Sequence, residues 1–180
     1  REMAWIFHEY SRIYGYTPGV VTGKPLHLGG SKGRVPATGW GVMLTTLKAI
    51  EKMGRQPEDC TCAVQGFGNV GSWAAKLLSE QGVKVVAVSD HTGGYHNPDG
   101  LDVRHAVDYV KENQTLEGYT GGTHVTNEEL ITMDVDILVP AAIENVITEQ
   151  YAEQVQAKLI VEVAYGPVSA NADSVLDEKG

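Results

Sequence analysis

The sequence predicts an α/β fold in which a doubly wound parallel sheet carries helices on both faces. Two observations support this fold class. Short apolar runs typical of buried strands alternate with segments of about ten residues in which apolar positions recur every three or four residues. Glycine-rich turns separate the two kinds of segment. Strands joined through helices form parallel pairs with right-handed crossovers, and such crossovers place helices on both faces of the sheet.

Length and charge narrow the class of protein. The chain has 180 residues, which predicts one domain spanning residues 1–180 with a sizeable core. Its 14 Lys and Arg against 23 Asp and Glu give a formal net charge of −9, which argues against nucleic acid as a partner. No apolar run approaches the roughly 20 residues of a membrane helix, and no signal-peptide pattern opens the chain. We therefore expect a soluble cytoplasmic protein with no membrane partner, or a mitochondrial matrix protein if the source is eukaryotic.

Cysteine and histidine placement predicts neither a disulfide nor a metal site. Cys60 and Cys62 lie one residue apart at the start of an expected strand, and we expect both to stay free thiols in a reducing compartment. The six histidines have no partner at a metal-ligand spacing.

The first expected element is a helix that ends near Gly15. Phe7, Tyr10 and Tyr14 lie on one face of it at intervals of three and four residues. No capping residue precedes this helix, and another helix has only begun at residues 172–177 when the sequence stops. We therefore expect a fragment of a longer protein, truncated at both ends.

A long loop is expected next. Residues 15–41 contain eight glycines and three prolines, a composition that suits neither a helix nor a central strand. Loops of this length within a compact domain are functional or disordered. Because a helix with an apolar face around Met43 and Ile50 follows directly, we favour an ordered binding loop, with a flexible connector as the alternative.

From Thr61 onward the pattern alternates between strand and helix. The first two strands and the helix between them form a βαβ unit. The expected strands are 61–65, 84–89, 136–139 and 159–163. The expected helices begin near Val70, Leu101, Asn127 and Thr148, the last ending at Val155, and residues 118–122 are expected to form a loop.

One motif carries the chemistry. Gly66-Phe67-Gly68-Asn69-Val70-Gly71 is a full G-x-G-x-x-G that follows a strand, opens a helix and is followed by Asp90 where the second strand ends. Gly66 permits the tight turn, Gly68 leaves room for a pyrophosphate, and Gly71 lets the helix approach the sheet. The free N–H groups and the dipole at the helix start favour phosphate. The motif predicts a Rossmann-like dinucleotide site, and a glycine-rich turn that binds nothing is the alternative.

The residue after the second strand bears on which dinucleotide binds. Asp90 is expected to accept hydrogen bonds from the adenosine ribose and to repel a 2′-phosphate, which favours NAD over NADP. NADP stays possible, because a protonated His91 could pair with the phosphate. An exposed loop histidine that binds nothing is the alternative for His91.

The later strand ends are expected to face the nicotinamide. Ala141 and Ala142 supply small side chains and backbone groups for a close approach, and Asn145 lies nearby. A helix cap is the alternative role for Asn145. No catalytic residue is assigned, because Lys24 and Lys32 have no obvious carboxylate partner and the spacing supports no Ser-His-Asp or Cys-His arrangement.

Several longer motifs resemble the glutamate/leucine/phenylalanine/valine dehydrogenase family, and its glutamate branch most closely. They are PGVVTGKP (18–25), GGS (29–31), GR (33–34), ATG (37–39), QGFGNVG (65–71), NPDGL (97–101) and DILVPAA (136–142). The resemblance implies the dinucleotide-binding domain of an enzyme that oxidatively deaminates glutamate, a small amino acid, to 2-oxoglutarate and ammonia. It also implies a homo-hexamer for the full-length protein.

The resemblance also implies roles for individual residues. Gly66 and residues 68–71 would hold the pyrophosphate and Asp90 the adenosine ribose, while Thr38 and Asn145 would lie on the nicotinamide side. The family's catalytic lysine and aspartate belong to a substrate domain that precedes Arg1, so the fragment alone is expected to be inactive.

One departure from the family pattern lies near the expected nicotinamide. EVAYGP (162–167) stands where the family usually has EGANGP, so Tyr165 replaces an asparagine and we expect weaker or rearranged nicotinamide binding. A nucleotide-sensing module that lost catalysis and a leucine- or valine-type enzyme are the alternative functions.

Overall fold

The structure, a computed structural model, describes residues 2–180 and divides into two compact units. One unit ends at Ala37, and the other runs from Thr38 to Gly180. The first contains helix α1 (Glu2–Tyr14) and two 3-10 turns, η1 (Pro18–Val20) and η2 (Leu26–Leu28).

The glycine-rich segment of the first unit has a defined conformation. Nζ of Lys24 donates hydrogen bonds of 2.6 Å to the backbone carbonyls of Pro18 and Val21. Phe7 is buried and packs edge-on against Tyr16, with 5.7 Å between the ring centroids. These contacts suit the ordered loop expected from the sequence, and a binding role for that loop stays a prediction.

The loop is shorter than predicted, because helix α2 (Ala37–Lys52) begins before residue 41. Gly39 is buried within this helix, and a Cβ atom there would lie 2.5 Å from Cβ of Trp73. The glycine is therefore explained by close packing between helices and not by a loop conformation.

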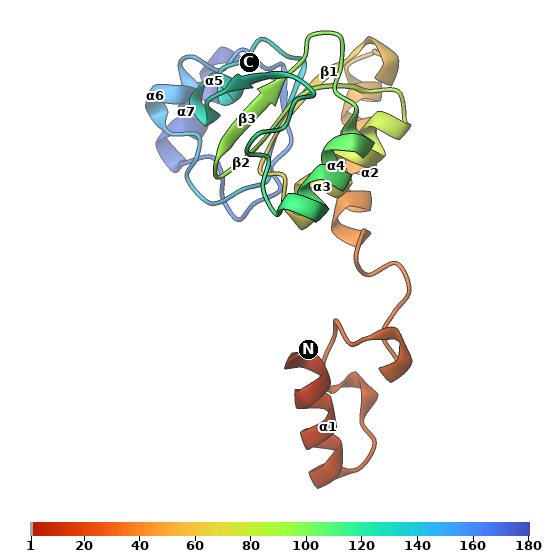
Figure 1. Cartoon of the computed structure of the whole chain (residues 1–180). Coiled ribbons are helices and arrows are strands. Elements are labelled where there is room, and N and C mark those ends of the chain that lie inside the picture. The colour runs from red at the N-terminus through yellow and green to blue at the C-terminus, as the bar shows by residue number, and fades with distance from the viewer. Residues whose placement is uncertain (1) are drawn as a thin grey trace. The chain divides into compact units, whose positions relative to one another are not determined.

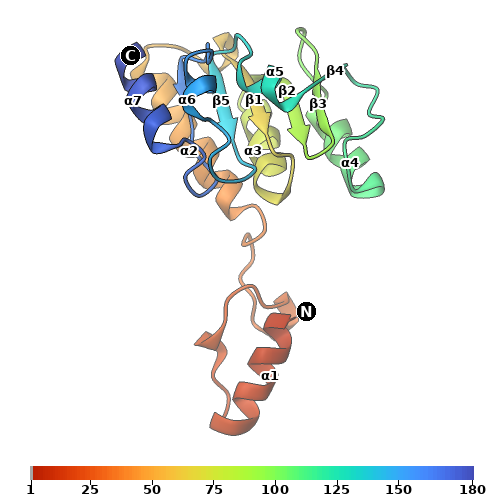
Figure 2. The same ribbon diagram turned by 90° about the vertical axis from the view of Figure 1, so that its left-hand side faces the viewer.

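The second unit is built on a six-stranded sheet in the order β4-β3-β2-β1-β5-β6. The strands are β1 (Thr61–Gln65), β2 (Lys84–Asp90), β3 (Gly93–His96), β4 (Thr123–Val125), β5 (Ile137–Pro140) and β6 (Leu159–Ile160). The pairs β1 with β2, β1 with β5, and β5 with β6 are parallel, as predicted. Figure 1 labels β1, β2 and β3, and Figure 2 shows β5, β1, β2 and β3 side by side in this order.

One edge of the mostly parallel sheet is antiparallel. β3 pairs antiparallel with both β2 and β4, and neither β3 nor β4 was predicted from the sequence. β3 returns directly after β2 through a tight turn, which an antiparallel pair permits and a parallel pair does not. β6 also ends at Ile160, earlier than the predicted residue 163.

Helices cover both faces of the sheet, as the doubly wound prediction requires (Figure 1). Buried residues of α2, α3 (Asn69–Glu80) and α4 (Val103–Asn113) form a core with one face. Buried residues of α5 (Asn127–Ile131), α6 (Glu149–Ala152) and α7 (Ala170–Lys179) form a core with the other. The alternation along β1 fits this arrangement, because Cys62 and Val64 belong to the first core and Ala63 to the second.

Side-chain caps explain where several helices begin. Oδ1 of Asp102 accepts from the backbone N–H of His105 at 3.0 Å, so α4 starts at Val103 and not at Leu101. Thr126 and Glu129 form a capping box that starts α5 at the predicted residue. α6 is shorter than the predicted helix 148–155.

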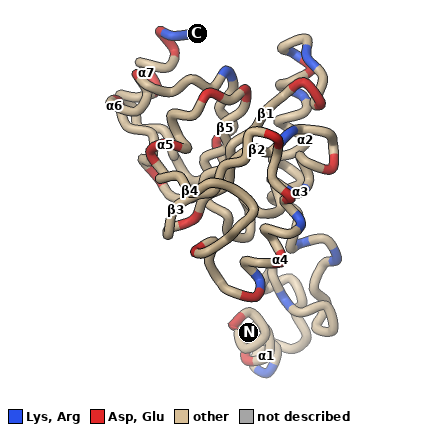
Figure 3. Tube along the Cα trace, turned by 45° about the horizontal axis from the view of Figure 1, so that its top comes forward, with Lys and Arg blue, Asp and Glu red and all other residues tan. Residues whose placement is uncertain are grey.

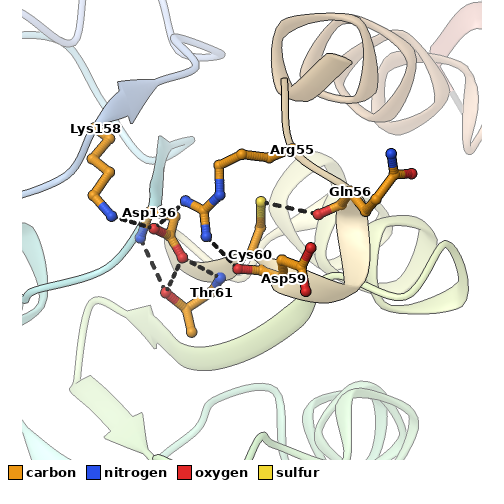
Figure 4. Close-up of polar contacts among 7 residues, drawn as sticks. All are labelled: Arg55, Gln56, Asp59, Cys60, Thr61, Asp136 and Lys158. Carbon is orange, nitrogen blue, oxygen red and sulfur yellow. Dashed lines mark hydrogen bonds and ion pairs between the residues drawn. The ribbon is translucent and has the colours of Figure 1, made fainter. Parts of the chain in front are cut away.

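A buried carboxylate joins the amino ends of β1 and β5, at the end of β1 opposite the glycine turn. Asp136 precedes β5 and accepts hydrogen bonds from Arg55, from Nζ of Lys158 at 2.9 Å, and from the backbone N–H and hydroxyl of Thr61 at 2.8 and 3.0 Å (Figure 4). Burial alone raises the pKa of Asp136, but the hydrogen bonds from Arg55, Thr61 and Lys158 outweigh burial and hold that pKa well below its usual range. The network ties the start of β1 to the start of β5.

Cys60 and Cys62 are buried free thiols, as expected, and burial raises the pKa of each. Acidic and basic positions are interspersed along the trace in Figure 3. Within residues 2–180, no helix is both long and apolar enough to cross a bilayer. The same residues contain no group of three or more His, Cys, Asp or Glu placed to hold a metal ion.

Candidate functional site

The carboxyl ends of β1, β2 and β5 meet where the direction of chain winding reverses. From β1 the chain passes through α3 to β2 on one side, whereas β5 lies on the other side of β1. Open α/β sheets bind ligands in the crevice at such a point. The backbone joins the three strand ends, because Gly66 N donates to Ser89 O at 2.8 Å and Ala141 N donates to Gln65 O at 2.8 Å.

Two glycines of the motif are required by packing. Gly66 has φ +93°, and a Cβ there would lie 2.7 Å from N of Ala142 and 2.8 Å from the carbonyl carbon of Ala141. A Cβ on Gly71 would lie 1.8 Å from the carbonyl oxygen of Gly66. Any larger residue at either position would push the turn away from the sheet.

Gly68 differs from these two glycines, because nothing lies within 4 Å of the place where its Cβ would be. It is exposed and is the N-cap residue of α3, and as a glycine it has no side chain that could accept a hydrogen bond from the first N–H groups of the helix. The first N–H groups of α3 therefore adjoin open space, and such a helix start favours anions.

A cavity of about 310 Å³ lies beside this turn. Its lining residues are Gly66, Phe67, Gly68, Asp90, His91, Val110, Gln114, Ala141 and Ala142. The cavity thus brings together the predicted glycine turn, the acid after β2 and the two alanines after β5. Phe67 is also part of the core, since its side chain is only 3% exposed.

Sequence reasoning missed Val110 and Gln114, which form the α4 wall of this cavity. The apolar periodicity of residues 103–110 predicted the helix, but it did not indicate that the last turn of this helix lines a cavity with the ends of β1 and β2. Gln114 is the C-cap of α4 and has φ +68°, a left-handed conformation that non-glycine residues seldom adopt.

Other predicted site residues lie outside the cavity. Asn69 lines a neighbouring groove of about 440 Å³ between α3 and α4. Val70 packs partly buried against the core, and Thr38 is exposed near the start of α2. Whether any of these residues contacts a cofactor stays a prediction.

Asn145 and Tyr165 lie on adjoining loops after β5 and β6. Asn145 has φ +54°, and its N–H donates to the carbonyl of Gly166 at 3.0 Å. It does not cap α6, whose N-cap is Thr148, so the alternative role for Asn145 is wrong for that helix. Tyr165 is 97% exposed, which leaves its ring free to meet a ligand or a neighbouring surface.

The Asp90 carboxylate already accepts three hydrogen bonds from the chain. Its Oδ1 accepts from the backbone N–H of Thr92 at 2.7 Å and from the Thr92 hydroxyl at 2.5 Å. Its Oδ2 accepts from the backbone N–H of Leu116 at 2.6 Å. His91, next in the sequence, is exposed.

Comparison with known proteins finds close relatives over the whole chain. An NADP-specific glutamate dehydrogenase A1 from Halobacterium salinarum is 50% identical over 182 residues, which cover 100% of this chain and 44% of that protein. A glutamate dehydrogenase from Thermotoga maritima is 51% identical over 180 residues, which cover 99% of this chain and 43% of that protein. The chain therefore spans less than half the length of these relatives.

Solved structures with the same fold include two glutamate dehydrogenases. The hetero-hexameric enzyme from Thermus thermophilus, in a leucine-bound form, matches 99% of this chain and 42% of its own with a TM-score of 0.91 and 37% identity. The Plasmodium falciparum enzyme matches 98% of this chain and 40% of its own with a TM-score of 0.88 and 25% identity.

The family assignment rests on the largest part of the sequence. The sequence profile described as Glutamate/Leucine/Phenylalanine/Valine dehydrogenase matches residues 29–180, which include the glycine turn and all strands of the sheet. With the whole-chain relatives and the shared fold, this match shows that the chain belongs to the Glutamate/Leucine/Phenylalanine/Valine dehydrogenase family.

Proposed function

We propose that this chain binds a nicotinamide dinucleotide across the carboxyl ends of β1, β2 and β5. It would serve as the dinucleotide-binding part of an enzyme that oxidatively deaminates glutamate to 2-oxoglutarate and ammonia. The observation that carries the proposal is the glycine turn at Gly66–Gly71, which leaves open space at Gly68 beside a cavity of about 310 Å³. The relatives named glutamate dehydrogenases favour this activity over a nucleotide-sensing module.

The residues of the turn fit a pyrophosphate. Gly66 and Gly71 bring the turn and the start of α3 close to the sheet, and Gly68 has no side chain to occupy the space in front of the helix. N–H groups at the start of α3, in residues 69–71, would donate to phosphate oxygens, with the helix dipole favouring the negative charge. Asn69 adds a polar side chain beside this turn.

The two halves of the dinucleotide would lie on opposite sides of the turn. The adenosine would occupy the cavity between the end of β2, with Asp90 and His91, and the α4 wall. The nicotinamide would lie toward Ala141 and Ala142, with Thr38, Asn145 and Tyr165 as further candidates. We expect NAD to be bound. NADP is the second possible ligand, because the Halobacterium relative is named NADP-specific.

The dinucleotide supplies a hydride acceptor when bound. The small residues Ala141 and Ala142 would let a flat ring approach the sheet edge, and the glycine turn would fix its position through the phosphates. No catalytic acid, base or lysine is assigned within this chain. By family resemblance those groups would come from a substrate domain, together with the surfaces that form a hexamer.

Gly68→Val offers the sharpest test of this proposal. Nothing lies within 4 Å of the Cβ position and the backbone there is extended, so the variant should still fold, with a loss of stability of about 1 kcal/mol because Val is a poorer N-cap than Gly. Its side chain would enter the expected pyrophosphate space, so we expect calorimetric titration with NAD to give at least a roughly hundredfold loss of affinity. Gly41→Ala in α2, where the Cβ also meets nothing, is the matched control. Equal NAD affinity in Gly68→Val and the unchanged chain would overturn the proposal.

A further inference from the structure

The acid at the end of β2 is fixed on both sides by the chain itself. Its carboxylate accepts from Thr92 and from the distant Leu116, and its backbone carbonyl accepts from Nδ2 of Asn127 at 2.9 Å. Oδ1 of Asn127 in turn accepts from the hydroxyl of Ser89 at 2.7 Å. The end of β2 is therefore attached to α5 through Asn127 and to the segment after α4 through the Asp90 carboxylate.

The Leu116 contact connects this acid to the wall of the cavity. Leu116 is completely buried in the core, so its N–H is in a fixed position when it meets Oδ2 of Asp90. Gln114, two residues earlier, is the left-handed C-cap of α4 and lines the cavity. A left-handed non-glycine conformation persists where the surrounding structure holds it. The hydrogen bond from Leu116 to Asp90 provides such support directly after the turn.

The same contacts limit what Asp90 can offer to a ribose. A carboxylate has about four acceptor positions, and donors of the chain itself occupy three of those positions on Asp90. Two ribose hydroxyls would have to displace a donor such as the Leu116 N–H, whose burial makes loss of its partner costly. The negative charge is also already shared among these donors, which weakens its power to repel a 2′-phosphate.

We propose that Asp90 is a positioning residue that holds Gln114, in the α4 wall of the cavity, in place, and that it is not the group that selects NAD against NADP. This inference rests on the proposed dinucleotide site and departs from the role expected from sequence alone. Its consequence is that replacing Asp90 weakens every ligand with an adenosine half, whether or not it carries a 2′-phosphate.

The test compares Asp90→Asn with Asp99→Asn. Asp99 is an exposed carboxylate in the turn before α4, so its replacement removes the same charge without touching the cavity. Each variant and the unchanged chain are titrated with NAD, NADP and AMP, and backbone amide exchange at residues 114–119 is measured without ligand. We expect Asp90→Asn to weaken all three ligands by a similar factor, roughly tenfold, and to speed Leu116 exchange at least tenfold. Asp99→Asn should change neither.

Three results would overturn the inference. A gain of NADP over NAD of roughly tenfold or more in Asp90→Asn would make Asp90 a charge discriminator. Lower stability with unchanged affinities would make it a purely structural residue. An unchanged exchange rate of the Leu116 amide in Asp90→Asn would show that the carboxylate does not hold the segment after α4. If the unchanged chain binds none of the three ligands, the proposed function fails, and the exchange measurement still decides whether Asp90 holds the wall.

A milder pair of variants guards against misfolding of Asp90→Asn. Thr92→Val removes one donor from the carboxylate with little change in side-chain shape, and Thr92→Ser keeps that donor. The segment is also held by the Gly118 N–H, which donates to the Tyr95 hydroxyl at 3.0 Å, so we expect graded effects. Thr92→Val should weaken NAD, NADP and AMP equally by several-fold, and Thr92→Ser should restore the affinities. Loss of affinity in both variants alike would contradict the proposal.

Discussion

Replacing Asp136 by Asn should destabilise the chain, because that carboxylate joins the amino ends of β1 and β5. The Asp136 side chain is 11% exposed and accepts from Arg55, Lys158 and two groups of Thr61. Asn keeps one oxygen for Thr61 but turns an N–H₂ group toward the two cations. Breaking a buried pair costs roughly 3–5 kcal/mol. The Lys158 side chain is 61% exposed and stays hydrated, which lowers the expected loss to about 2 kcal/mol.

The loss can be measured by urea unfolding at neutral pH, with Asp134→Asn as control, since Asp134 is an exposed carboxylate two residues away. A loss of about 2 kcal/mol corresponds to a fall in Tm of about 4–8 °C for a chain of this size. Asp134→Asn should stay within about 0.5 kcal/mol of the unchanged chain. Equal stability of the Asp136 and Asp134 variants would refute the reasoning.

The same carboxylate predicts a difference at acid pH. The pKa of Asp136 is lower in the folded chain than the unfolded value of about 3.9, so its contribution to stability is complete above that value. The contribution is lost as pH falls from about 4 toward the folded pKa. The unfolding free energy of the unchanged chain should therefore fall more steeply between about pH 4 and 2 than that of Asp136→Asn. Parallel pH profiles would contradict this.

Three further substitutions test individual features. Gly71→Ala puts a Cβ 1.8 Å from the Gly66 carbonyl oxygen and should cost about 3 kcal/mol in urea unfolding, and a neutral result would contradict the packing argument. Asp102→Ala removes the cap that accepts from His105 N–H and should cost about 1 kcal/mol, read from the same curves, whereas Asp102→Ser should recover most of it. Tyr165→Asn should raise the affinity for NAD and leave that for AMP unchanged in calorimetry, and no change in either would count against a nicotinamide-side role.

The parts of the fold predicted from the sequence are those with a strong local pattern. β1 and β2 are continuous apolar runs, and α3 carries an uninterrupted helical periodicity, so their positions were predicted within a residue. β3 has the sequence Gly-Gly-Tyr-His, too short and too rich in glycine to be distinguished from a turn. Gly39 was predicted in a loop, because its packing against Trp73 depends on the tertiary structure.

The site was predicted only in part, because some of its contacts depend on the tertiary structure and not on a local pattern. The glycine turn, Asp90 and the two alanines follow from strand ends that share one edge of the sheet, and the cavity brings them together. Gln114 lines the cavity with Asp90, which precedes it by 24 residues, and Leu116 donates to Asp90 across 26 residues. No local sequence pattern indicates such contacts. The sequence therefore identified the acid but not its partners.

Amide hydrogen exchange of the unchanged chain, measured with and without saturating NAD, reports where a dinucleotide binds. If NAD binds at the carboxyl ends of the strands, exchange should slow in residues 66–71 of the glycine turn and the start of α3, in residues 90–92 and around Gln114, with smaller effects at 141–142. Backbone amides of α7, on the opposite face of the sheet, should not change. Protection confined to regions away from these strand ends, or no protection at all, would contradict a dinucleotide site at this edge.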